Sequence, residues 1–445
     1  MQDKMEHSSI LIGLALVFGF YMAWNIGAND VANAMGTSVG SGALTLKQAV
    51  VVAGILEFAG AFLLGSHVAN TVRKGIVNPE IFMGDPIVFV LGMLAALLAA
   101  GAWLQIASYC GWPVSTTHSI VGAVIGFGAL VGGVQAVNWG KVVSIAASWV
   151  VSPLISATLS FFIFMLLRKK IFRSVTPVSE AKRLTPVLVF FVFAILALVM
   201  VFKGLKNLHL HLSFLHALLV ATAIGCVGAL LSAVWVSRLK LTDNSANLNN
   251  GRALANINTL QTARTRDDVG LKEKNYQGVE KIFVYLQILS ACFIAFAHGA
   301  NDVANAIGPL AAVVSVIKTG VVGLKATVPL WALVIGGIGI VIGLATWGWR
   351  VIETIGKKIT ELTPTRGFSA TFAAAVTVVV ASRLGLPIST THSLVGAVMG
   401  VGLAGGIEAL NLNAIRDIVL SWVITIPASA VLTIGFYYFL TLFFL

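Results

Sequence analysis

The sequence predicts an all-α polytopic membrane protein. Of its 445 residues, 58% are hydrophobic and only 10% are charged, and the apolar stretches are continuous. Soluble domains carry about 25% charged residues, and a water-soluble fold this apolar would expose a large apolar patch. An outer-membrane barrel would instead show alternating segments of about ten residues.

The net charge of +12 does not indicate a nucleic-acid-binding protein, because the charge is concentrated in one stretch. Of the 46 charged residues, 13 lie between Arg238 and Lys281, and basic loops are typical of the cytoplasmic side of membrane proteins. Cys110, Cys226 and Cys292 lie in apolar stretches without the spacing of a zinc site or a disulfide framework. We therefore expect no nucleic-acid partner and no cofactor.

About twelve membrane segments follow from the rule of about 20 apolar residues per crossing. They run over 8–34, 46–66, 86–110, 113–131, 139–167, 185–203, 214–237, 282–307, 329–349, 367–384, 387–404 and 415–444. The stretches 86–131 and 367–404 each either cross the membrane twice or form a re-entrant hairpin.

Two motifs occur twice in the same order. The octapeptide GANDVANA at 27–34 recurs letter for letter at 299–306, and residues 113–128 recur at 387–402 with 12 of 16 positions identical. The chain therefore consists of two homologous halves with a connecting part. We predict a first transporter repeat over 8–167, a linking unit with two transmembrane helices over 168–237, a basic cytoplasmic linker over 238–281 and a second repeat over 282–445.

The two repeats are predicted to have inverted topology. Each half has an odd number of crossings and the linking unit an even number, so the second half enters from the opposite side. Re-entrant hairpins would not change this parity. Inverted repeats are typical of secondary transporters that bind substrate at the membrane midplane. With 168–184 and 238–281 in the cytoplasm, 20 of the 29 lysines and arginines lie inside and both termini lie outside the cytoplasm.

Polar residues of the first motif lie late in the first and eighth segments. They are Asn29, Asp30, Asn33, Asn301, Asp302 and Asn305. Ionisable groups at membrane depth are costly and usually functional. We expect Gly27 and Gly299 to open the helices and free backbone carbonyls, which with carboxylate and amide oxygens would bind a hard cation such as sodium. The alternative is hydrogen bonding between helices alone.

The second motif, Ser-Thr-Thr-His-Ser, predicts a helix that begins inside the membrane-spanning region. A proline precedes each copy (Pro113 and Pro387), and Ser and Thr are strong helix N-caps. A helix N-terminus carries about half a positive charge and free N–H groups, which bind anions. Ordinary capping is the alternative. The candidate anion ligands are Ser115, Thr116, Thr117, Ser389, Thr390 and Thr391.

The charges of these groups indicate that an anion would need accompanying cations. Two helix N-termini contribute about +1 against −2 from two aspartates, so cations must enter with the anion. Glu57 interrupts an apolar segment and either completes a cation site, accepts a proton or is a hydrogen-bonded structural carboxylate. His118 and His392 are proton sites, anion donors or packing residues.

The chain resembles the PiT inorganic phosphate transporter family. The resemblance rests on the paired GANDVANA and P-[VI]-S-T-T-H-S motifs and on GTSVGSGALTLKQ at 36–48. It implies that the Asn, Ser and Thr residues of both motifs bind phosphate, and that Asn29, Asp30, Asn301, Asp302 and Glu57 bind co-transported sodium. It further implies a sodium-type member in a prokaryotic inner (plasma) membrane, and a homodimer.

The resulting hypothesis is a secondary active transporter, not an enzyme, that takes up inorganic phosphate with sodium by alternating access. A proton-coupled phosphate or metal-phosphate symporter and a sulfate permease of the same family remain as alternatives. An anion channel is a more distant one. The expected partners are phosphate, sodium and the lipid bilayer.

Overall fold

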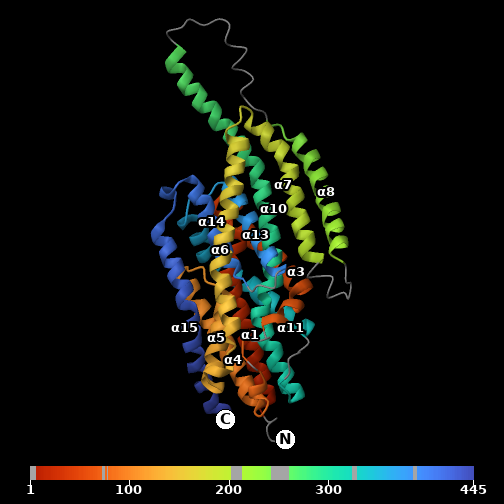
Figure 1. Cartoon of the computed structure of the whole chain (residues 1–445), viewed down its shortest axis with the longest axis vertical. Helices are drawn as coiled ribbons and strands as arrows, with labels where there is room; N and C mark the ends of the chain where they lie inside the picture. The colour runs from red at the N-terminus through yellow and green to blue at the C-terminus, as the bar shows by residue number, and fades with distance from the viewer. Residues whose placement is uncertain are drawn as a thin grey trace.

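The chain folds almost entirely into helices (Figure 1). The computed structural model describes residues 7–72, 76–77, 79–201, 213–241, 260–322, 328–383 and 388–445. Among them, the one β-type contact is an isolated antiparallel bridge between Val77 and Val137. Ten helices in this part of the chain are long and apolar enough to cross a membrane. The all-α polytopic class is therefore confirmed.

The helix bounds follow the predicted segments closely. The first half holds α1 (Ser8–Asp30), α2 (Ala32–Gly40), α3 (Leu46–Val72), α4 (Pro86–Cys110), α5 (Thr116–Gly132) and α6 (Trp139–Leu167). The linking unit holds α7 (Pro177–Val199) and α8 (Phe214–Arg238). The second half holds α10 (Leu260–Thr319), α11 (Leu330–Trp347), α12 (Trp349–Glu353), α13 (Pro364–Arg383), α14 (Thr390–Gly405) and α15 (Leu412–Phe444).

Short turns complete these elements. Three 3₁₀ turns are η2 (Pro79–Phe82), η3 (Val134–Ala136) and η8 (Ile407–Ala409), and two π-turns are η4 (Arg168–Phe172) and η7 (Thr354–Lys358). Each of the twelve predicted segments overlaps a helix, but α5 and α14 have only 17 and 16 residues. At about 1.5 Å per residue they fall short of the roughly 30 Å hydrocarbon core. A count of twelve crossings is therefore not confirmed.

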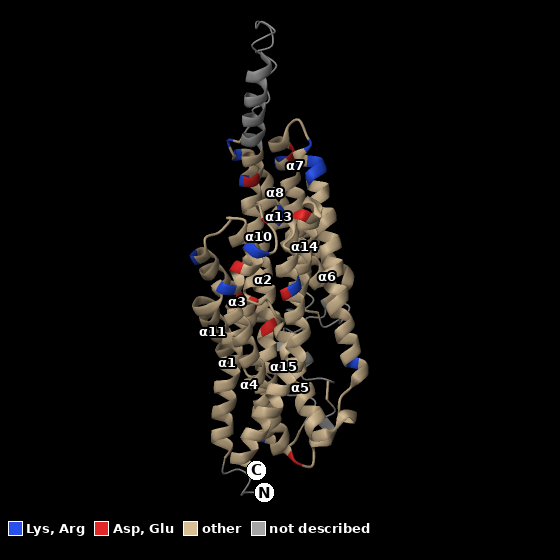
Figure 2. Cartoon of the chain, turned by 90° about the vertical axis from the view of Figure 1, so that its left-hand side faces the viewer, with Lys and Arg blue, Asp and Glu red and all other residues tan. Residues whose placement is uncertain are grey.

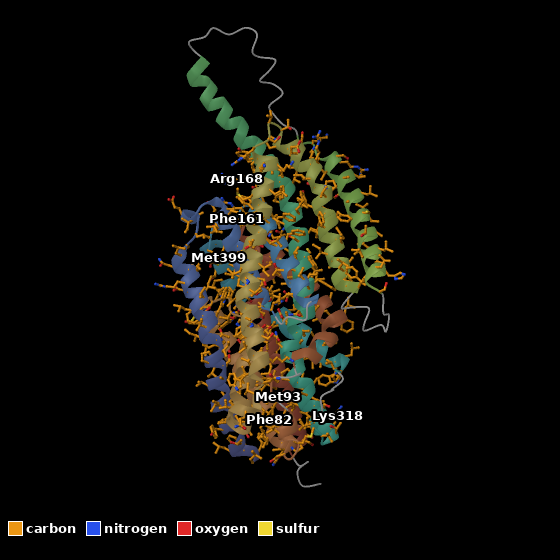
Figure 3. All side chains as sticks on the ribbon, viewed as in Figure 1. Phe82, Met93, Phe161, Arg168, Lys318 and Met399 are labelled. Carbon is orange, nitrogen blue, oxygen red and sulfur yellow. The ribbon has the colours of Figure 1, made fainter. Side chains whose placement is uncertain are left out.

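Two helical hairpins lie in opposite halves of the molecule. Helices α4 and α5 lie in the half where α1 begins and α15 ends, whereas α13 and α14 lie in the other half, in both views (Figures 1 and 2). The labelled side chains agree, because Phe82 and Met93 lie near one end and Met399 and Arg168 lie toward the other (Figure 3). Gly111, with φ of 69°, ends α4 in a left-handed conformation.

The glycines of the duplicated octapeptide do not open their helices. Helix α1 continues through Gly27 to Asp30, and α10 continues through Gly299, so that prediction is wrong. The one interruption is Val31, a single turn residue between α1 and α2. The glycines serve close packing instead: a Cβ at Gly27 would lie 1.9 Å from Ile340 O, and one at Gly299 would lie 2.1 Å from Glu57 O.

Each half packs chiefly on the other. Helix α1 packs on α11, and α3 packs on α10; likewise α5 packs on α15, and α6 packs on α14. The glycine contacts repeat this exchange, because Gly122 lies against the Ile426 carbonyl and Gly396 against the Pro153 carbonyl. Such reciprocal contacts, in which residue i meets j and the counterpart of i meets the counterpart of j, are what a two-fold relation produces.

The predicted linker is partly helical. Helix α10 begins at Leu260, so 260–281 of the predicted linker is helical, while 242–259 lies outside the described residues. The stretch 271–281 is rich in Lys and Glu, which are good helix formers, and a helix that extends a longer one needs no apolar stripe of its own. Pro387 also lies outside the described residues.

Helices α7 and α8 form a pair at the side of the molecule. They pack on each other, and α7 also packs on α10 (Figure 1). Val178, Val189 and Val192 of α7 share a buried apolar cluster with Phe283 and Leu286 of α10. This pair lies outside the exchanged packing of the two halves, as expected for a linking unit.

Candidate functional site

Two helix N-termini meet in the interior of the molecule. Helices α5 and α14 are capped by Ser115 and Ser389, whose hydroxyls accept hydrogen bonds from the backbone N–H of His118 (3.3 Å) and His392 (3.1 Å). The predicted helix starts are therefore confirmed. We call the first turn of α5 or α14, with the residues just before it, the tip of its helical hairpin. The Thr391 hydroxyl lies 3.2 Å from the Val114 carbonyl oxygen, so the tips of the two halves are in contact.

Each aspartate of the octapeptides accepts a hydrogen bond from the tip of its own half. The Thr116 hydroxyl donates to Asp30 Oδ2 at 2.7 Å, and the Thr390 hydroxyl donates to Asp302 Oδ2 at 3.2 Å. The Asn301 amide donates to Asp302 Oδ1 at 2.8 Å. Asp30 and Asp302 are buried. The motifs that are far apart in each half thus form one cluster.

The second asparagine of each octapeptide reaches the tip of the opposite half. Asn33 Nδ2 donates to the Thr391 hydroxyl at 2.7 Å. Asn305 Nδ2 lies 3.1 Å from the Thr116 hydroxyl and 3.4 Å from that of Thr117. Amide N–H groups and threonine hydroxyls thus lie together at both helix N-termini, where binding of an anion is favoured.

A histidine that the sequence interpretation missed joins the carboxylates. His298 Nε2 lies 2.8 Å from Asp302 Oδ2 and 3.7 Å from Asp30 Oδ2. Its Nδ1 lies 3.1 Å from Glu57 Oε1. All four side chains are at most 2% exposed. One ligand atom from each of Asp30, His298 and Asp302 lies within 4.8 Å of the other two, which is close enough for a single cation to contact all three.

The signal for His298 is an unequal pair of positions. It precedes Gly299, and at the repeat offset the first half has Ile26 before Gly27. Glu57 belongs to α3, which packs on α10 as α11 packs on α1. Gly299 lies against the Glu57 carbonyl and Gly27 against the Ile340 carbonyl, so Ile340 is the equivalent of Glu57. At one contact between the halves a polar pair, Glu57 and His298, thus stands where the equivalent contact has two buried isoleucines, Ile340 and Ile26.

Asn29 lies beside the cluster but uses its amide elsewhere. Its Nδ2 donates to Ser108 Oγ (3.1 Å) and to the Trp112 carbonyl oxygen (2.9 Å), and its Oδ1 accepts from Val114 N–H (3.1 Å). These bonds hold the turn between α4 and α5 against α1. The geometry shows Asn29 as a support of the first tip, and its predicted ligand role stays a prediction.

The two motif histidines face each other. The ring centroids of His118 and His392 are 4.4 Å apart, and each ring lies on a tryptophan, with centroid distances of 3.6 Å to Trp149 and 3.7 Å to Trp422. Neither ring nitrogen of His118 has a hydrogen-bond partner among the described residues. This aromatic contact joins α5 to α14. It favours a packing role for His118 and His392 over hydrogen-bond donation to an anion.

Comparisons with known proteins decide the family. A model of the phosphate transporter family matches residues 26–433. The chain belongs to the phosphate transporter family. As a member of this family it is a membrane transporter and not an enzyme.

Individual relatives agree with the family match. The chain is 48% identical over 439 residues to inorganic phosphate transporter 2-1, chloroplastic, of Arabidopsis thaliana, covering 96% of this chain and 72% of that protein. It is 45% identical to a putative phosphate permease of Pyrococcus abyssi, covering 94% and 95%. A solved structure described as the sodium-dependent phosphate transporter is similar at 40% identity and a TM-score of 0.84, covering 98% of this chain and all of that one.

Proposed function

We propose that this transporter takes up inorganic phosphate together with sodium by alternating access. One observation carries the proposal: two helix N-termini and two aspartates, drawn from both halves, converge in one buried cluster. A cluster built from both halves changes its access when the halves move relative to each other, because each half supplies part of its wall.

The aspartates are the cation-binding groups. Carboxylate, hydroxyl and amide oxygens are ligands that hard cations prefer. Asp30, Asp302 and Glu57 supply three carboxylates within reach of one imidazole. Sodium ions bound here would replace contacts that His298 makes, since its Nε2 lies 2.8 Å from Asp302 Oδ2. The predicted sodium contacts of Asn29 and Asn301 belong to this proposal.

The helix tips are the phosphate-binding groups. Their N-terminal N–H groups and the hydroxyls of Thr116, Thr117, Thr390 and Thr391 offer hydrogen bonds, and the α5 and α14 dipoles favour an anion. Asn33 and Asn305 already direct amide donors at these tips. Two helix N-termini of about +1 in total cannot offset two aspartates, so sodium must accompany phosphate. This electrostatic requirement is the physical basis of coupling.

The predicted inversion of the halves would allow alternating access, and the packing of the helices supports it. The exchanged packing of α1 with α11 and α3 with α10, together with hairpins in opposite halves of the molecule, is what an axis in the membrane plane predicts (Figure 1). With basic loops inside, both termini lie outside the cytoplasm and the membrane is the plasma (inner) membrane. A homodimer stays a prediction that measurement of the oligomeric state tests.

Uptake of labelled phosphate into proteoliposomes tests the proposal. Separate sodium and proton gradients are imposed, and we expect the sodium gradient alone to concentrate phosphate. Concentration by a proton gradient alone would favour the proton-coupled alternative, and inhibition by sulfate that does not change with pH would favour a sulfate permease. Equilibration without concentration would indicate an anion channel.

A further inference from the structure

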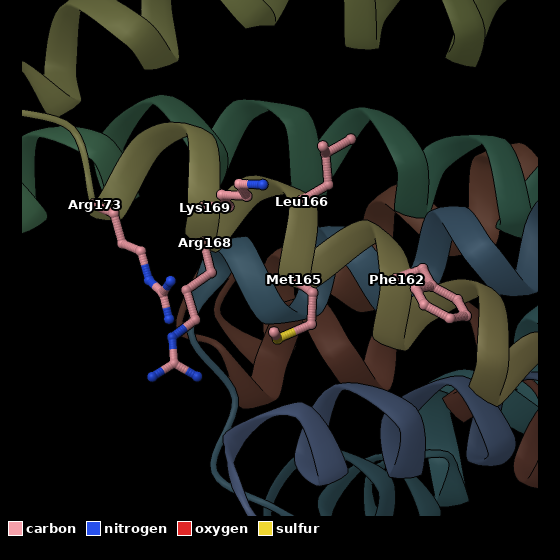
Figure 4. Close-up of a pocket in the computed structure, with 6 residues that line it drawn as sticks. All are labelled: Phe162, Met165, Leu166, Arg168, Lys169 and Arg173. Atoms are coloured by element: carbon pink, nitrogen blue, oxygen red, sulfur yellow. The ribbon is translucent and has the colours of Figure 1, made fainter.

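A groove at the end of α6 and along η4 shares no lining residue with the candidate phosphate site and combines exposed apolar and basic side chains. It is lined by Phe162, Met165, Leu166, Arg168, Lys169 and Arg173 (Figure 4). Phe162 is 62% exposed and Leu166 is 56% exposed, and both belong to a helix long and apolar enough to cross a membrane. The apolar part of the groove therefore faces the place where lipid chains would lie.

The geometry points to a binding site for an anionic phospholipid in this groove. The headgroup phosphate would lie between the guanidinium groups of Arg168 and Arg173, and an acyl chain would lie along Phe162, Met165 and Leu166. In Figure 4 the two arginine side chains project to the same side of the helix, and Met165 follows them along α6.

A wide helical turn brings the two arginines together. Residues Arg168–Phe172 form a π-turn, and the Arg173 N–H donates to the Arg168 carbonyl oxygen at 3.1 Å. Isolated π-turns are rare in proteins, and those that occur are often found at functional sites. In an α-helix these two residues would point in different directions, because five residues correspond to about 500° of rotation. Here the turn places both guanidinium groups on one face.

The charge of the groove is not neutralised by the described part of the protein. None of the ion pairs formed between described residues uses Arg168, Lys169 or Arg173. Lys and Arg gather at this end of the molecule (Figure 2), the end predicted to be cytoplasmic. The cytoplasmic leaflet carries the anionic lipids, and basic pockets on that side bind their headgroups. A free phosphate ion would not use the apolar floor, so we commit to lipid.

The groove also touches the second hairpin. Arg168 Nη1 donates to the Ala404 carbonyl oxygen at 3.3 Å, in the last turn of α14. A phospholipid headgroup held by Arg168 would therefore brace α6 against the end of α14. We expect bound lipid to raise the thermal stability of the transporter.

The test measures binding of fluorescent phosphatidylglycerol and phosphatidylcholine to the purified full chain in detergent. The wild type is expected to prefer phosphatidylglycerol. The variant Lys169→Gln/Arg173→Gln leaves the Arg168–Ala404 contact in place and should weaken phosphatidylglycerol binding about 30-fold, from about 1 kcal/mol per basic residue. Its phosphatidylcholine binding should not change.

A matched control removes the same charge elsewhere. Lys281 and Lys358 are exposed, and Lys281→Gln/Lys358→Gln should bind phosphatidylglycerol as the wild type does. Phe162→Ala should weaken lipid binding, and inorganic phosphate should not displace the lipid. Equal binding of the two lipids by the wild type, an equal loss in the control variant, or displacement by inorganic phosphate would each overturn the proposal.

Discussion

The two halves of the molecule are alike at the N-termini of α5 and α14 and unlike beside the aspartates. Both tips have a serine cap, a threonine that donates to an aspartate, and an asparagine from the opposite half. Next to the octapeptide, however, the first half has the buried isoleucine Ile26, whereas the second has His298, which is bonded to Glu57 of the first half. Under the proposed alternating-access mechanism, the shared parts are those that both conformations must use.

The difference between Ile26 and His298 gives the two aspartates different environments. Asp30 Oδ2 accepts from Thr116, and its Oδ1 lies 3.4 Å from the Thr391 hydroxyl. Asp302 instead has His298 at 2.8 Å and Asn301 at 2.8 Å. Cations bound at the two positions would therefore exchange with different groups: two hydroxyls at Asp30, and one hydroxyl, an amide and an imidazole at Asp302.

The largest expected effect is the loss of either aspartate. Asp30→Asn or Asp302→Asn should abolish sodium-coupled phosphate uptake, because a neutral amide cannot supply the charge that attracts the cation. Uptake into proteoliposomes measures this, and the amount of inserted protein should be unchanged. Asp417→Asn removes an exposed carboxylate and should transport normally. Near-normal uptake by either site variant would contradict the shared role of the two halves.

The next effect concerns the polar pair Glu57 and His298, which is present at only one of the two equivalent contacts between the halves. His298→Ile leaves Glu57 buried without its partner, and breaking a buried pair costs about 3–5 kcal/mol. The double variant Glu57→Ile/His298→Ile copies the Ile26 and Ile340 arrangement and should recover most of that loss in a thermal unfolding assay. Its sodium dependence of uptake should remain impaired.

This pair of variants separates a structural role from a transport role. A double variant as unstable as His298→Ile would show that the halves are not interchangeable here. A double variant with wild-type sodium dependence would show that His298 and Glu57 serve packing alone.

The close approach of the halves predicts a smaller, symmetric effect. Gly27→Ala and Gly299→Ala each place a Cβ about 2 Å from a backbone oxygen of the other half (1.9 and 2.1 Å). Overpacking of this kind costs about 1–3 kcal/mol, and we expect equal falls in thermal stability. Gly13→Ala meets nothing within 4 Å and is the control. Unequal falls would indicate that the packing is not reciprocal.

The smallest effect distinguishes the two tips. Thr391→Val removes a buried hydroxyl that accepts from Asn33 at 2.7 Å, whereas Thr117 is half-buried and lies 3.4 Å from Asn305. Loss of such a hydrogen bond costs about 1 kcal/mol, so Thr391→Val should raise the Kd of phosphate about fivefold and Thr117→Val less. Sodium affinity should change less than phosphate affinity in both. An equal change in both affinities would place these hydroxyls in the cation site.

Much of the fold could be predicted because apolar length and duplication are visible in the sequence. The helix starts at Ser115 and Ser389 followed from proline and capping residues, and both are confirmed. The error at Gly27 and Gly299 arose because a glycine in a helix serves either a break or a close contact. Only the packing partner, Ile340 or Glu57, decides between them.

The meeting of the motifs could be expected, but its detail could not. Duplication indicated that Asp30 and Asp302 are equivalent, yet no local pattern reports a contact across 241 residues such as that of His298 with Glu57. The comparison of Ile26 with His298 was available in the sequence as a difference between the copies. Differences between repeats are informative because symmetry makes the rest of the site alike.

The most direct test of the central claim is a reciprocal binding measurement. Calorimetry gives the phosphate affinity of the purified protein in sodium and in choline, and the sodium affinity with and without phosphate. The account predicts that each ligand strengthens the other by the same factor, as linkage requires. Phosphate that binds equally well in choline would contradict the claim that cations at Asp30 and Asp302 make the site able to hold an anion.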